Sequence, residues 1–127
     1  EQMKTMKASG LVDIQSHAKS HSSLVTRMTP EADYQRWLAT EVSGSQRVLE
    51  KRLGHRVDLF SYPYGDSNEA VALVLKKQGF RLASTVQRGG NPRFSDPYRL
   101  RRTMVYSGDD LNSFKRKLQT FVPLRNP

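Results

Sequence analysis

Apolar and polar positions along the chain follow the period of a helix in some segments and that of a strand in others. The longest helical pattern runs from Thr29 to Gly54. Thr29 offers a capping hydroxyl, Pro30 suits the first helical position, and Gly54 is a typical stop. The pattern predicts one long helix with a single apolar face. The residues of that face are Tyr34, Trp37, Leu38, Val42, Leu49 and Leu53.

Shorter elements of both kinds are predicted on either side of this helix. Because strands alternate with helices, the order predicts βαβ units and a mainly parallel sheet. We expect a single α/β domain over residues 1–127. Further helices are expected at 1–8, 68–78 and about 110–121, and strands at 11–16, 57–62, 80–86 and 101–106.

Composition narrows the class of protein. A hydrophobic fraction of 36% favours a packed domain over a disordered chain. No apolar run approaches the roughly 20 residues of a membrane helix, so we expect no transmembrane segment. Cysteine is absent, which excludes disulfides and thiolate ligands. The net charge of +9 is compatible with an anionic partner, but the basic residues are scattered, so we expect a solvated basic surface and no nucleic-acid partner.

Two histidines, His17 and His21, directly follow the first predicted strand. Two histidines four apart can point the same way on one helical turn and share a metal ion. The zinc-protease pattern requires a glutamate where this chain has Ala18. Asp13 is a poor third ligand, because it lies four residues back along a strand, roughly 13 Å away. The spacing alone favours two surface or capping histidines, whereas the place at a strand end favours metal ligands.

A second motif, FSYPYGD at residues 60–66, ends the second predicted strand. Taken alone, it is a proline-glycine turn with aromatic packing. The functional interpretation is a rigid loop at a strand end that offers backbone N–H groups to a developing oxyanion. The spacing leaves both interpretations open. Because the carboxyl ends of parallel strands lie at the same end of a sheet, we expect this loop to lie beside His17 and His21.

Together, the two motifs resemble the polysaccharide deacetylase family, also called the NodB-homology domain or carbohydrate esterase family 4. Residues 11–24, a strand that runs into Ser-His-x-x-x-His, are similar to the histidine motif of the family. Residues 60–65 are similar to its Pro-Tyr motif, and the segments around 79–80 and 101–105 also fit. The resemblance is nearest to the biofilm-type poly-N-acetylglucosamine deacetylases.

The resemblance implies part of a distorted, incomplete (β/α) barrel with mainly parallel strands, from which the N-terminal strands are missing. It implies hydrolysis of N-acetyl groups from an N-acetylglucosamine-type polysaccharide, outside the cytoplasm or at the cell envelope. His17 and His21 would bind a divalent metal, most often zinc. This metal would polarise the acetamide carbonyl and activate the attacking water. Pro63 and Tyr64 would contact the substrate, and the backbone N–H of Tyr64 would hold the oxyanion.

The sequence departs from the family at three places. The Asp-Asp motif that precedes the histidine motif, and supplies the base and the third metal ligand, has no counterpart here. The usual arginine ahead of the Pro-Tyr pair is Ser61, for which Arg102 is a candidate replacement. No Leu-x-His motif lies near the C-terminus; His55 is interpreted as a surface residue and Asp66 as a turn aspartate.

These departures predict that the isolated chain binds metal weakly and is inactive. They also predict an exposed apolar sheet edge through which copies of the chain associate. The alternative function is a non-catalytic module with a basic surface that binds carbohydrate or nucleic acid.

Overall fold

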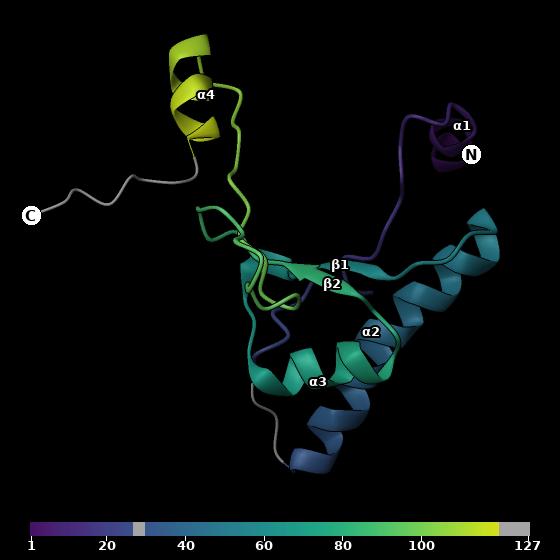
Figure 1. The fold of residues 1–127 in the computed structure, drawn as a ribbon. Helices are drawn as coiled ribbons and strands as arrows, with labels where there is room; N and C mark the ends of the chain where they lie inside the picture. The colour runs from purple at the N-terminus through teal and green to yellow at the C-terminus, as the bar shows by residue number, and fades with distance from the viewer. Residues whose placement is uncertain (27–29, 120–127) are drawn as a thin grey trace, which may run out of the picture.

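The computed structural model describes residues 1–26 and 30–119 of the chain. Two short parallel strands are joined through a helix, and α2 and α3 cover one face of the resulting sheet (Figure 1). The predicted α/β order with parallel strands is confirmed. In chain order the elements are α1 (Gln2–Ala8), α2 (Glu31–Leu53), β1 (Leu59–Ser61), the 3₁₀ turn η1 (Pro63–Gly65), α3 (Glu69–Lys77), β2 (Leu82–Ser84) and α4 (Leu111–Leu118).

The predicted helices form, and local signals explain their ends. Gly54 ends α2 in the left-handed conformation, at φ 63°. The side chains of Asn68 and Asp110 cap the first turns of α3 and α4. The predicted capping residue Thr29 and the predicted end of the last helix, near residue 121, lie outside the described residues. Within residues 1–26 and 30–119, no helix is long and apolar enough to cross a membrane.

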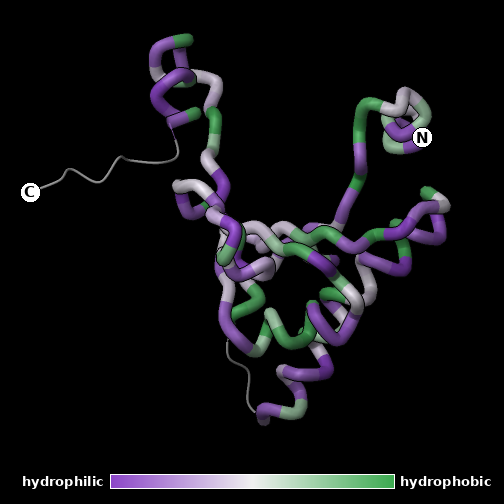
Figure 2. The backbone as a smooth tube through the Cα atoms, in the orientation of Figure 1, coloured by the Kyte–Doolittle hydropathy of each residue, from purple (hydrophilic) through white to green (hydrophobic). Residues whose placement is uncertain are grey.

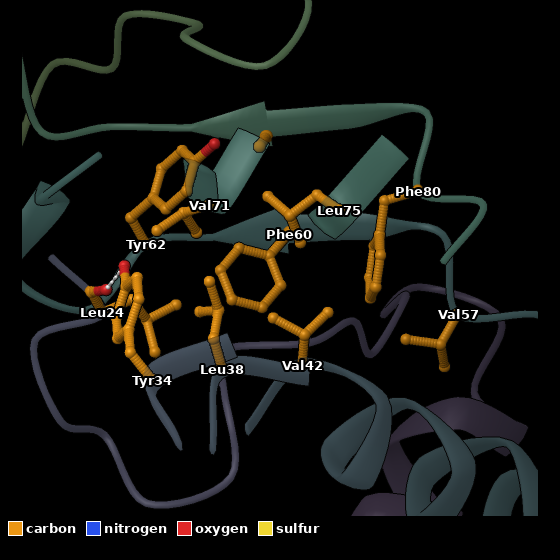
Figure 3. Close-up of a cluster of buried hydrophobic side chains, with 11 residues drawn as sticks. Leu24, Tyr34, Leu38, Val42, Val57, Phe60, Tyr62, Val71, Leu75 and Phe80 are labelled. Carbon is orange, nitrogen blue, oxygen red and sulfur yellow. Dashed lines mark hydrogen bonds between the residues drawn. The ribbon is translucent and has the colours of Figure 1, made fainter. Parts of the chain in front are cut away.

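The hydrophobic core lies between the sheet and the helices α2 and α3 (Figure 3). The ring of Phe60 in β1 meets the rings of Tyr62 and Phe80 edge-on, with centroids 5.5 Å apart in both pairs. The hydroxyl of Tyr34 donates to the carbonyl of Leu24 at 2.7 Å and holds the loop before α2 against the core. In Figure 2, hydrophobic positions recur along α3 and the strand segments. The predicted apolar face of α2 is confirmed, with Tyr34, Leu38, Val42 and Leu53 buried and Trp37 and Leu49 packed against the core.

The strand predicted at residues 11–16 is wrong for most of its length. Only Ser16 pairs, in a parallel bridge with Phe60. The cause is Gln15, whose side-chain oxygen accepts the backbone N–H groups of Asp58 and Leu59, both at 3.0 Å. A side chain thereby takes donors that a longer ladder would use.

The strand predicted at residues 101–106 does not form either. β2 pairs instead with the residue just before this segment, because Ser84 forms a parallel bridge with Leu100. The backbone of Arg101 is bonded instead to the side chain of Asn91, which accepts its N–H at 2.8 Å and donates to its carbonyl at 2.9 Å. The Asn91 side chain thus occupies the backbone groups that would otherwise pair with a neighbouring strand.

A buried carboxylate ties the starts of the two strands together. Asp58 accepts bonds from Arg81 Nε at 2.6 Å and Arg81 Nη2 at 3.1 Å, and Arg56 Nε lies 3.0 Å away. The hydrogen bond from Arg81 holds the pKa of Asp58 below its usual value, although burial opposes this shift. The backbone N–H of Arg81 also donates to the carbonyl of Asp58 at 2.8 Å, which closes a double link between the strand entries.

Candidate functional site

The loops that follow three parallel segments lie at one edge of the sheet. Ser16 pairs in parallel with β1, and β1 pairs in parallel with β2, so the carboxyl ends of all three segments point the same way. The first loop contains His17 and His21, the second contains Tyr64, and the third begins at Val86. Functional side chains commonly gather at such an edge.

His17 is fixed by the backbone of β1. Its Nδ1 lies 2.7 Å from the carbonyl oxygen of Ser61. Because a carbonyl only accepts, Nδ1 carries the proton, and the lone pair of the neutral ring is on Nε2. His17 is exposed, so this nitrogen is available to a ligand from solvent.

The structure brings three aromatic rings of the two motifs together. The ring centroids of His17 and His21 are 4.8 Å apart, in an edge-on arrangement with an interplanar angle of 64°. The His21 and Tyr64 rings are also 4.8 Å apart, at 62°. The Pro-Tyr loop therefore lies beside the histidine pair, as expected for two strand ends at one edge of a sheet.

The histidine loop is not a helical turn, and that part of the sequence interpretation is wrong. Ala18 and His21 have φ values of 61° and 59°, and Tyr64 has 57°. Among the described residues, these are the positive-φ positions occupied by an amino acid other than glycine. A left-handed conformation costs a residue with a Cβ roughly 1–2 kcal/mol. Such strain clusters at functional sites, where surrounding contacts hold it in place.

The Pro-Tyr loop is held by the rigid ring of Pro63 and by the close packing of Gly65 against Val86. Pro63 is buried, whereas Tyr64 is 63% exposed. Gly65 has φ 77°, and a Cβ on it would lie 2.7 Å from the backbone nitrogen of Val86. The N–H groups of Gly65 and Asp66 donate within the turn, while that of Tyr64 makes no hydrogen bond with the described residues.

His17 and His21 fit part of a zinc site. Zinc accepts histidine nitrogens as ligands, and a ligating imidazole usually donates its other N–H to a carbonyl or a carboxylate. The bond from His17 to the Ser61 carbonyl has this form. In the described part of the chain, however, no group of three or more histidine, aspartate or glutamate side chains could hold a metal ion. The two histidines are therefore a partial donor set.

Asp66 and Asp13, the acidic residues considered from the sequence, have other partners, as does the Asp109-Asp110 pair, which the sequence did not single out. Asp66 accepts a hydrogen bond from the hydroxyl of Ser23 at 2.8 Å, which links the Pro-Tyr loop to the chain after His21. Asp13 accepts from the side chain of Gln15 at 3.0 Å. The Asp109-Asp110 pair serves α4, where Asp109 is paired with Lys117 and Asp110 caps the helix.

Arg102 and His55 are the remaining residues singled out from the sequence. The backbone N–H of Arg102 donates to the carbonyl of Gln87 at 2.8 Å, and its buried Nε has no partner among the described residues. These contacts do not bring it to the histidine pair. His55, interpreted from the sequence as a surface residue, is partly buried: its side chain is 20% exposed and its Nε2 lies 2.9 Å from the carbonyl of Ile14.

Sequence reasoning missed Glu41, a buried residue of α2. Its carboxylate accepts the backbone N–H groups of Lys19 and Ser20, which lie between the two histidines. A signal was present, since Glu41 follows Leu38 by three residues and Trp37 by four, within the apolar stripe of the helix. An acid at such a position requires a polar partner inside the fold.

Comparisons with known proteins identify a matching family and similar folds. Residues 1–83 match the family described as polysaccharide deacetylase. The Streptococcus pyogenes deacetylase PplD in complex with acetate is similar in structure, with a TM-score of 0.79 and 24% identity over 96% of this chain and 50% of that one. IcaB from Ammonifex degensii has a TM-score of 0.71 and 27% identity over 84% of this chain and 47% of that one. A de-N-acetylase from Aggregatibacter actinomycetemcomitans has a TM-score of 0.79 and 18% identity over 91% of this chain and 51% of that one.

The chain thus spans about half the length of the solved structures that it matches. No curated protein matches its sequence. The family pattern nevertheless covers well over half of the 127 residues and includes the histidine and Pro-Tyr motifs, so the chain belongs to the polysaccharide deacetylase family.

Proposed function

We propose that this chain supplies the histidine and Pro-Tyr part of a metal-dependent active site that hydrolyses N-acetyl groups of an N-acetylglucosamine-type polysaccharide. The observation that carries the proposal is the meeting of His17, His21 and Tyr64 at one edge of a parallel sheet. Membership of the deacetylase family supports the reaction class. The proposed setting is a distorted, incomplete (β/α) barrel that acts outside the cytoplasm or at the cell envelope.

In this proposal His17 and His21 hold a divalent metal, most favourably zinc, through ring nitrogens. His17 would use Nε2, because the Ser61 carbonyl engages Nδ1 and fixes the orientation of the ring. A zinc ion bound there would supply Lewis acidity toward an acetamide carbonyl and toward water. The third ligand and the base belong to the Asp-Asp motif of the family, for which the described residues offer no substitute.

Tyr64 has two proposed roles. Its backbone N–H is not used within the turn, so it can donate to the oxygen that gains charge as the acetamide carbon becomes tetrahedral. One such donor typically contributes about 10²–10³ in rate. Its exposed ring beside His21 forms the proposed contact with the sugar. Pro63 was also expected to contact the substrate, but its side chain is fully buried, so its proposed part is to hold the turn. Arg102 follows the Leu100 bridge to β2, and its described contacts do not bring it to the histidine pair. For its guanidinium we propose long-range stabilisation of the negative charge on the same acetamide oxygen.

Acetate release from N-acetylglucosamine oligomers tests this function. The 127-residue chain with added zinc or cobalt is expected to release acetate negligibly, because the donor set is partial. The same chain extended upstream of Glu1 by an Asp-Asp segment of the family is expected to release acetate, and His17→Ala is expected to abolish the activity. Full activity of the short chain would contradict the missing-carboxylate argument and make Asp66 the first residue to replace. Undiminished activity of the extended His17→Ala variant would contradict the metal role.

A further inference from the structure

Glu41 is a carboxylate placed on the inner side of a helix. It lies in α2 between the core residues Leu38 and Val42, and its residue surface is only 5% exposed. A buried charge without partners would cost far more than a neutral side chain at this position. Its place in the fold therefore calls for a specific set of donors.

Those donors belong to the loop that carries the two histidines. Glu41 Oε2 accepts the backbone N–H of Lys19 at 3.1 Å and that of Ser20 at 2.8 Å. Hydrogen bonds to an ionised acceptor are stronger than bonds between neutral groups. Both donors lie in the three-residue stretch between His17 and His21, so one oxygen atom clamps the centre of the loop.

The same face of α2 also contacts the start of the histidine loop. One turn after Glu41, the hydroxyl of Ser45 lies 2.6 Å from that of Ser16, the residue before His17. The aliphatic stem of Lys19 lies along the same helix, because a Cβ on Gly44 would be 3.4 Å from its Cδ. The loop is therefore supported by the helix on one side, while most of its residues face solvent on the other.

The backbone of this loop needs such support. Ala18 and His21 flank the clamped amides, and both have positive φ values that a residue with a Cβ rarely adopts. Without external bonds, Ala18 and His21 would relax toward ordinary backbone conformations. The ring of His21 would then leave its place 4.8 Å from both His17 and Tyr64.

We propose that Glu41 is a positioning residue for the histidine pair. Its carboxylate fixes the backbone of residues 18–21, and this holds the two imidazoles in one geometry. The consequence for metal binding rests on the proposed function, whereas the clamp itself does not. Contacts one step removed from a metal typically change its affinity by about 10–100-fold when they are lost.

The test compares four versions of the 127-residue chain: wild type, Glu41→Ala, Glu41→Gln and Glu50→Ala. Glu50 is the matched control, because it lies in the same helix and its Oε1 accepts a backbone N–H from Val57 at 3.0 Å, away from the histidines. Glu41→Gln retains an oxygen that can accept both amides. Amide hydrogen exchange of Lys19 and Ser20 reports the clamp, and a cobalt titration followed by visible absorption reports the metal site.

Glu41→Ala is expected to speed the exchange of both amides at least tenfold and to weaken cobalt binding about tenfold or more. Glu41→Gln is expected to restore most of the protection and most of the affinity, and Glu50→Ala to leave both unchanged. Unaltered exchange in Glu41→Ala would overturn the positioning role, whether or not cobalt binds. A Glu41→Gln variant as impaired as Glu41→Ala would overturn it too. If wild type binds no cobalt, the proposed function fails, and the exchange data still decide whether the clamp exists.

Discussion

Replacing Gly65 by alanine tests the contact that holds the Pro-Tyr loop in place. Gly65 has φ 77°, and a Cβ there would lie 2.4 Å from Val86 Cγ2 and 2.7 Å from the backbone nitrogen of Val86. The side chain of Val86 can rotate, but its backbone follows β2 and cannot move freely. The left-handed conformation costs alanine about 1–2 kcal/mol, and forcing a methyl group into a packed site costs about 1–3 kcal/mol. Gly65→Ala should therefore lower the free energy of unfolding by about 2–5 kcal/mol.

Gly79→Ala separates the two contributions. Gly79 has a similar φ of 81°, but nothing lies within 4 Å of a Cβ built on it. This variant should lose only the backbone contribution, about 1–2 kcal/mol. Urea unfolding followed by circular dichroism gives both values, provided that the free energy of unfolding falls equally steeply with urea concentration in the two variants. Equal losses in the two variants would refute the packing of the Pro-Tyr loop against Val86.

Three further predictions concern the strand entries, the core and the sheet edge. Asp58→Asn should lower the free energy of unfolding at pH 7 by about 1–3 kcal/mol, because the charge-assisted bonds from the largely exposed Arg81 are lost. The folded pKa of Asp58 is lowered, so its contribution is present above the unfolded value of about 3.9 and is lost as the pH falls through the folded value. Stability curves of wild type and Asp58→Asn should therefore approach each other in acid, and curves that stay parallel would contradict the ion pair. Leu38→Ala removes a fully buried side chain and should cost about 2–5 kcal/mol by urea unfolding, whereas a loss below 1 kcal/mol would argue against its core position. If copies of the chain associate through the apolar groove around Leu59 and Leu82, sedimentation should show association that Leu82→Glu weakens, and an unchanged profile would exclude that surface.

The helices were predictable because their signals are local. The apolar stripe of α2, Gly54 at its end and the segment that begins at Asn68 all depend on neighbours within a few residues. The strands were harder, because side chains take part of their backbone pairing. Gln15 bonds the amides of Asp58 and Leu59 at the start of β1, and Asn91 bonds both backbone groups of Arg101. No periodicity along the sequence reports such bonds.

The candidate site was predictable in its placement and not in its detail. Parallel strands bring their carboxyl ends to one edge, so the sequence indicated that His17 and Tyr64 would lie close together. The conformation of the loop was not accessible, because positive φ values at Ala18 and His21 have no signature in alanine or histidine. The clamp from Glu41 depends on the packing of α2 beneath the loop, and a pattern along the helix shows only that its carboxylate is buried.

The most direct test of the central claim is a zinc titration followed by NMR of the imidazole nitrogens. The chain has three histidines, and His55, which is engaged with Ile14, serves as an internal control. Before zinc is added, His17 should show the tautomer with the proton on Nδ1, because that nitrogen donates to the carbonyl of Ser61. Zinc should then shift the resonances of His17 and His21 together, with Nε2 as the responding nitrogen of His17, and leave those of His55 unchanged. A response confined to His55, or none at either His17 or His21 at saturating zinc, would contradict the assignment of this histidine pair as part of a deacetylase metal site.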